Sequence, residues 1–72
     1  MYEVIFFTGG ITKLKNLFNN CLQNGGYIIF ENVHYPRVKK MIREFVCEFY
    51  KHLNVLGLYG YETQFIIQKK NT

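Results

Sequence analysis

The spacing of hydrophobic residues changes along the chain, and each change predicts a new structural element. Residues 2–7, YEVIFF, are rich in β-branched and aromatic side chains and stop at Thr-Gly-Gly, which predicts a strand and a turn. From Ile11 the hydrophobic residues recur every three or four positions, which predicts a helix over about residues 10–23. Asn-Gly-Gly at 24–26 tolerates the left-handed backbone that often ends a helix, so we interpret it as the C-terminal cap.

The pattern after residue 26 predicts a further strand, a second helix and a last strand. YIIFENV at 27–33 predicts a second strand, and Pro36, which favours the first turn of a helix, predicts where a second helix begins. A third strand is predicted within residues 59–70, where polar and apolar residues alternate, as in a strand near the edge of a sheet. The second helix is expected to end before Gly57, and its hydrophobic positions are Val38, Met41, Ile42, Phe45, Val46, Phe49, Tyr50 and Leu53.

The order strand, helix, strand, helix, strand predicts a small α/β fold in one domain spanning residues 1–72. We expect a single β-α-β-α-β layer with a three-stranded sheet and two helices, and two-layer α+β packing is the alternative. The first two strands are apolar on both faces, so both faces need a cover. If the helices lie on one face, a second molecule must cover the other, and we expect a homodimer. The expected dimer contacts are Cys47, Phe7, Ile28 and Phe30.

Charge and cysteine content indicate which kind of partner and which cellular compartment to expect for the protein. Nine Lys and Arg against five Glu give a net charge of +4, a modest excess that favours an anionic partner only weakly. With two cysteines, no signal-peptide pattern and no apolar run of the ~20 residues that a membrane helix needs, we expect a soluble cytoplasmic protein without a membrane partner. Accessory proteins of viruses and mobile elements often have this size.

The chemistry-bearing residues do not form a known catalytic or metal-binding pattern. The chain contains no Ser and no Asp, which excludes a Ser-His-Asp triad. Glu44 and Glu48 are spaced as a helical pair, and we interpret them as ion-pair partners of neighbouring cations. The two cysteines and two histidines lack the close spacing of zinc ligands, and the Thr-Gly-Gly turn lacks the other residues of a phosphate loop. We therefore expect no enzyme activity, no cofactor and no metal.

The polar face of the second helix is the most informative surface. Cys47 lies nearly opposite its hydrophobic side, which is compatible with an incidental surface thiol, a subunit contact or a reactive thiol. Our leading hypothesis is a non-enzymatic interaction protein, homodimeric and regulatory or inhibitor-like, that occupies a surface on another macromolecule. Nucleic-acid binding through the basic face of the helix is the alternative. The residues expected to contact either partner are Arg37, Lys39, Lys40, Arg43, Lys51, Tyr35 and Tyr59.

Overall fold

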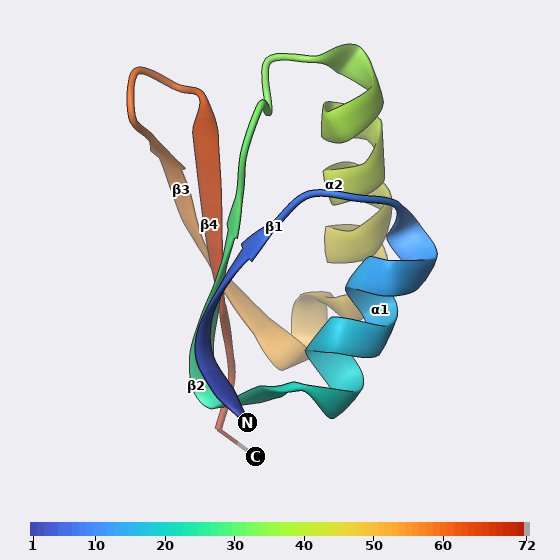
Figure 1. The fold of residues 1–72 in the computed structure, drawn as a ribbon, viewed down its shortest axis with the longest axis vertical. Helices are drawn as coiled ribbons and strands as arrows, with labels where there is room; N and C mark the ends of the chain where they lie inside the picture. The colour runs from blue at the N-terminus through green and yellow to red at the C-terminus, as the bar shows by residue number, and fades with distance from the viewer. Residues whose placement is uncertain (72) are drawn as a thin grey trace.

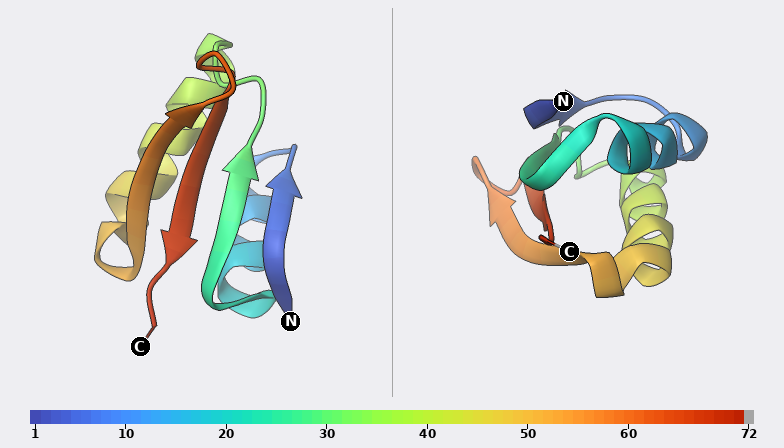
Figure 2. Two further views of the ribbon diagram at one scale, coloured as in Figure 1. Left: turned by 90° about the vertical axis from the view of Figure 1, so that its left-hand side faces the viewer. Right: turned by 90° about the horizontal axis from the view of Figure 1, so that it is seen from below.

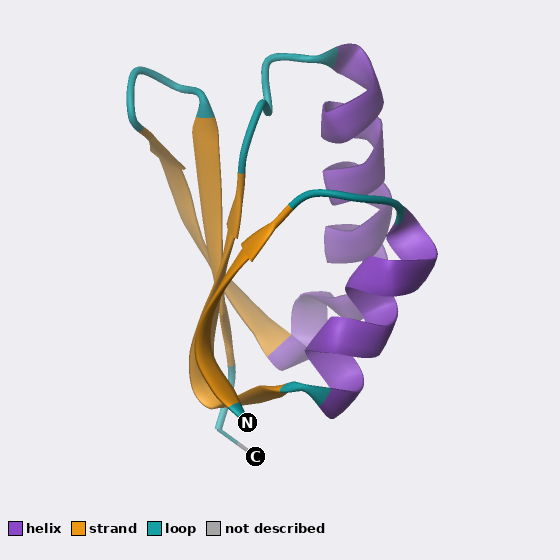
Figure 3. Ribbon diagram, viewed as in Figure 1, coloured by secondary structure: helices purple, strands orange, loops and turns teal. Residues whose placement is uncertain are grey.

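The computed structural model describes residues 1–71, which form a mixed four-stranded sheet with two helices packed on one of its faces (Figures 1 and 3). None of the helices in this range is long and apolar enough to cross a membrane. The elements in chain order are β1 (Tyr2–Phe7), α1 (Ile11–Asn20), β2 (Leu22–Phe30), α2 (Pro36–Phe49), the 3-10 turn η1 (Tyr50–His52), β3 (Leu53–Tyr59) and β4 (Gln64–Lys69).

The strand order in the sheet is β1-β2-β4-β3, with β1 parallel to β2 and β4 antiparallel to both of its neighbours. Two helices combined with a sheet confirm the broad class predicted from the sequence, but the prediction of three strands is wrong. Both helices cover the same face, which leaves the other face of the sheet open to view in Figure 2. The arrangement is therefore the two-layer alternative.

The missed strand lies where the second helix was expected to continue. The helix ends at Phe49, and Leu53 begins β3, where it is buried and pairs with Lys69. A turn at residues 60–63 then interrupts the strand predicted over residues 59–70. Gly60, Tyr61 and Glu62 all have positive φ there, at 59°, 58° and 66°, so the chain reverses and β4 returns between β2 and β3. The last strand is therefore central and not near an edge.

The first helix is shorter than predicted because residues 22–26 join β2. The pairing of β1 with β2 shifts register between Tyr2 and Val4, and Gly25 in this segment has φ 83°. A Cβ on Gly26 would lie 2.7 Å from Leu22 Cδ1, 2.9 Å from the Gln23 carbonyl oxygen and 3.0 Å from the Glu3 carbonyl oxygen. Asn-Gly-Gly therefore forms an irregular stretch of strand, and its second glycine is required for close backbone approach.

The hydrophobic core fills the space between the sheet and the helices, and Phe30 lies within its aromatic cluster. Its ring makes edge contacts with Phe7 at 5.9 Å and Phe45 at 6.4 Å between centroids. Phe7, Ile28 and Phe30 are 3%, 0% and 0% exposed, so the prediction that they contact a second chain is wrong. They are covered instead by the helices of their own chain.

Lys69 of β4 links the sheet to the C-terminal end of α1 through hydrogen bonds. Its Nζ donates hydrogen bonds to the carbonyl oxygens of Phe18 at 2.7 Å and Leu22 at 3.0 Å, and it lies 5.2 Å from the centre of the Phe18 ring. The last turn of α1 contains no basic residue of its own. A cation from β4 therefore satisfies carbonyls at the negative end of the helix dipole.

Candidate interaction surfaces

The face of the sheet opposite the helices carries apolar side chains. Pairing places Val4 beside Tyr27 and Phe6 beside Ile29, while Ile29 also pairs with Ile66. Successive side chains of a strand point to opposite faces, so these residues point away from the core that their neighbours form. Phe6 is 65% exposed and Val4 is 44% exposed. We call Val4, Phe6, Tyr27, Ile29 and Ile66 the outer sheet face.

No charged side chain interrupts the outer sheet face along the paired strands. The other paired strand positions on this side are Asn54, Gly57, Tyr59, Gln64 and Gln68, and none of them is charged. The excess of cations is therefore carried by other parts of the molecule. A contiguous apolar surface without charges is typical of a protein contact.

The cations of α2 and η1 lie exposed on the helix side of the molecule. Within residues 1–71 the one ion pair joins Lys15 of α1 to Glu48 of α2, with 2.9 Å between Nζ and Oε1. The interpretation of Glu48 as a partner of cations on its own helix is therefore wrong. No carboxylate among the described residues pairs with Arg37, Lys39, Lys40, Arg43 or Lys51, and all five are exposed.

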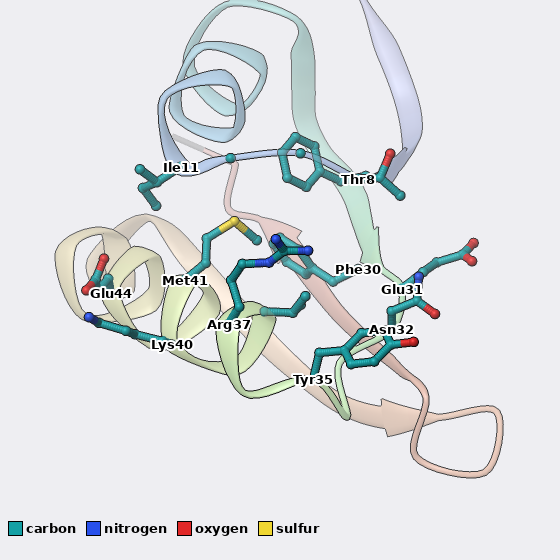
Figure 4. Close-up of a pocket in the computed structure, with 14 residues that line it drawn as sticks. Thr8, Ile11, Phe30, Glu31, Asn32, Tyr35, Arg37, Lys40, Met41 and Glu44 are labelled. Atoms are coloured by element: carbon teal, nitrogen blue, oxygen red, sulfur yellow. The ribbon is translucent and has the colours of Figure 1, made fainter.

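A hollow of about 610 Å³ lies between α2, the turn after β1 and the end of β2. Figure 4 shows Arg37 projecting into it, with Lys40 and Glu44 on one side and Glu31 on the other. Two cations and two carboxylates leave this hollow without net charge. It therefore lacks the excess positive charge expected of a phosphate site, although Gly9 and Gly10 line its rim.

A second hollow, of about 620 Å³, lies between α2 and the β3–β4 hairpin. Val55 and Leu58 pair with Ile67 and Phe65 and so point to the helix side, yet they are 51% and 53% exposed. Figure 1 shows the reason: the twist of the sheet carries the hairpin tip away from the first half of α2. We call this the α2–hairpin groove, and its apolar lining is Val33, Ile42, Val46, Val55, Leu58 and Phe65.

The residues with nucleophilic or metal-binding side chains are dispersed. Glu31 lines the first hollow and His34 the α2–hairpin groove, while exposed Cys47 lines neither. No three His, Cys or Glu side chains among residues 1–71 are close enough together to hold a metal ion. The structure thus does not bring Cys47 together with Glu31 or His34 in one hollow.

The residues expected to form a partner surface do not form one patch. Arg37 and Lys40 line the first hollow, whereas Lys39 and Arg43 line the α2–hairpin groove on the other flank of the helix. Tyr35 packs on His34 with 4.3 Å between ring centroids, and Tyr59 lies in β3 opposite Gln64. Lys51 is separated from the other cations at the far end of α2, in η1.

The chain matches no protein-family model, no curated protein and no solved structure. The surfaces described above are therefore the basis for inferring its function. The outer sheet face follows from the alternation within residues 2–7 and 27–30, but its continuation through Ile66 requires the pairing of β4 with β2. The α2–hairpin groove depends on β3, which the sequence pattern did not predict.

Proposed function

We propose that the protein is a small non-enzymatic interaction protein that forms a homodimer through its outer sheet face. The observation that carries this proposal is one-sided packing: both helices cover one face of the sheet, while Val4 and Phe6 are exposed on the other. A sheet face of this kind gains free energy when another apolar surface removes it from water.

A second copy of the chain is a suitable cover because the face carries no charge. Each copy has a net charge of +4, so two copies repel each other unless their cations stay apart. Contact between outer sheet faces keeps the cations of α2 on the far sides of both molecules. The face is thus self-complementary, as a two-fold symmetric interface requires.

The size of the face limits the strength of the dimer. Four strands at about 4.8 Å spacing and six residues at about 3.3 Å each give a footprint of roughly 19 by 20 Å. This is about half of the roughly 800 Å² per partner that a standard interface buries. We therefore expect a dimer that dissociates in the micromolar range or above.

Dimerisation through the outer sheet face leaves the helix side free to occupy a surface on another macromolecule. That side presents Arg43, which has no carboxylate partner among residues 1–71, and the exposed Tyr35 ring; Arg and Tyr are both enriched at protein interfaces. The proposed action is binding alone, without chemistry on the partner.

The test is the mass of the protein in solution, measured by light scattering from micromolar to millimolar concentration. The mass is expected to rise towards twice 8.6 kDa, whereas 8.6 kDa throughout would contradict the proposal. Tyr27→Glu, which places a like charge on each face, is expected to keep the protein monomeric. Tyr50→Glu is the matched control, because Tyr50 is exposed in η1 on the helix side, and it is expected to leave the mass unchanged.

Nucleic-acid binding is the second candidate, and the observation that favours it is the absence of carboxylate partners for the α2 cations within residues 1–71. Such cations are free to neutralise phosphates. A gel-shift titration with DNA and RNA at low and high salt tests this function. Binding that weakens steeply with salt and is lost in Lys40→Glu would support it, whereas no shift at micromolar protein would exclude it.

A further inference from the structure

The α2–hairpin groove is an apolar surface separate from the outer sheet face. Its floor belongs to the helix side of the sheet, where Val55 and Leu58 stay about half exposed while Ile67 beside them is fully buried. Ile42 and Val46 of α2 form the opposite wall. The helices of this chain thus leave the last two strands incompletely covered.

The open end of the groove is held in place by backbone contacts. The Val33 amide donates to the Thr63 carbonyl oxygen at 3.2 Å, which joins the hairpin turn to the segment between β2 and α2. The Thr63 hydroxyl and amide both donate to the Gly60 carbonyl oxygen, at 2.6 and 3.3 Å. The groove is therefore formed before any partner arrives, which lowers the entropy cost of binding.

The two sides, or banks, of the α2–hairpin groove differ in charge: α2 contributes cations, and the hairpin turn contributes a carboxylate. Lys39 and Arg43 line it from α2, are exposed and have no carboxylate partner among the described residues. Glu62, at the hairpin tip, is the one carboxylate along the lining. The groove thus combines an apolar floor with a cationic bank.

We propose that the α2–hairpin groove binds a short peptide segment of a protein partner, in which apolar side chains alternate with or flank carboxylates. The apolar residues would cover Val55 and Leu58, while the carboxylates would reach Lys39 and Arg43. This inference rests on the proposed function in that the protein acts by binding a macromolecule, but it uses a different surface from the dimer. A peptide is favoured over nucleic acid because phosphates gain nothing from covering an apolar floor.

The experiment is selection of random peptides displayed on phage against the purified full chain. Enriched peptides are expected to combine Leu, Ile, Phe or Trp with Asp or Glu. Their binding is expected to weaken about tenfold or more in Arg43→Glu and in Leu58→Gln, both of which change exposed side chains. Lys13→Glu, which reverses the charge of an exposed residue of α1 that lines neither hollow, is the matched control and is expected to retain binding.

Three results would overturn the proposal: no enrichment, enrichment of basic peptides, or binding that Arg43→Glu and Leu58→Gln leave intact. Displacement of the peptides by an oligonucleotide would also overturn it, because nucleic acid would then be the ligand of the cationic bank. The same binding measured on monomeric Tyr27→Glu separates the two proposals. Peptide binding without a dimer in the unmodified chain refutes only the outer-face dimer, and a dimer without peptide binding refutes only the groove.

Discussion

Phe6→Thr is the substitution that best distinguishes the contribution of the outer sheet face to the dimer from the contribution of the core to folding. Phe6 and Phe7 are adjacent in β1, but Phe6 is 65% exposed and Phe7 is 3% exposed. Threonine is β-branched and, like phenylalanine, is enriched in strands, so the substitution removes apolar surface with little change to the backbone preference. It is expected to weaken the dimer and to leave folding of one chain almost unchanged.

The exposed fraction of Phe6 sets the expected magnitude. Taking about 200 Å² for a phenylalanine side chain, 65% exposure leaves roughly 130 Å² for a partner to cover. At about 25 cal/mol per Å² this corresponds to about 3 kcal/mol per copy, as an upper limit. The dissociation constant of the dimer is therefore expected to rise up to about 100-fold for each Phe6 removed from the interface.

Sedimentation equilibrium gives the dissociation constant, and urea unfolding at high dilution gives the stability of the monomer. Phe6→Thr should change the free energy of unfolding by no more than about 0.5 kcal/mol. Phe7→Thr is the matched control: it removes a buried ring 5.9 Å from Phe30, so unfolding should become easier by about 3 kcal/mol or more. A dimer of unchanged strength in Phe6→Thr, or a loss of stability equal to that of Phe7→Thr, would refute the reasoning.

Three further substitutions test individual contacts by denaturant unfolding. Gly26→Ala should destabilise the fold by about 2 kcal/mol, because its Cβ would meet two backbone carbonyl oxygens at 2.9 and 3.0 Å; stability like that of the parent chain would show that the strand relaxes. Gly10→Ser should stabilise it by a few tenths of a kcal/mol, since Gly10 caps α1 without a side-chain hydrogen bond and nothing lies within 4 Å of a Cβ placed there; a loss of stability would argue against this cap. Lys69→Met should cost about 1–3 kcal/mol by leaving the carbonyl oxygens of Phe18 and Leu22 without their donor, and an unchanged midpoint would mean that water replaces it.

The sequence predicted the alternation of β1 and β2 but not which side of these strands becomes the core. Phe7, Ile28 and Phe30 lie on one side, and Phe6, Tyr27 and Ile29 on the other, and both sets are apolar. The choice between two apolar sides depends on the face to which α1 and α2 cross, which is a property of the whole topology. This is why three of the four expected dimer contacts, Phe7, Ile28 and Phe30, lie in the core, whereas Cys47 is exposed.

The third strand was missed because its first residue continues the period of the preceding helix. Phe49, Tyr50 and Leu53 are spaced as on one helical face, so the local pattern is ambiguous. Pairing with β4 resolves it, since Leu53 and Val55 lie beside Lys69 and Ile67. By contrast, the start of α2 at Pro36 was predicted correctly, because the fixed φ of proline acts locally.

The central claim is that a second copy covers the outer sheet face, and it can be tested by contacts between differently labelled chains. A mixture of ¹³C-labelled and unlabelled protein at millimolar concentration allows isotope-filtered NOE spectra to report only contacts between copies. The proposal predicts intermolecular contacts among the side chains of Val4, Phe6, Tyr27, Ile29 and Ile66. Contacts confined to α2, or no intermolecular contacts at this concentration, would contradict it.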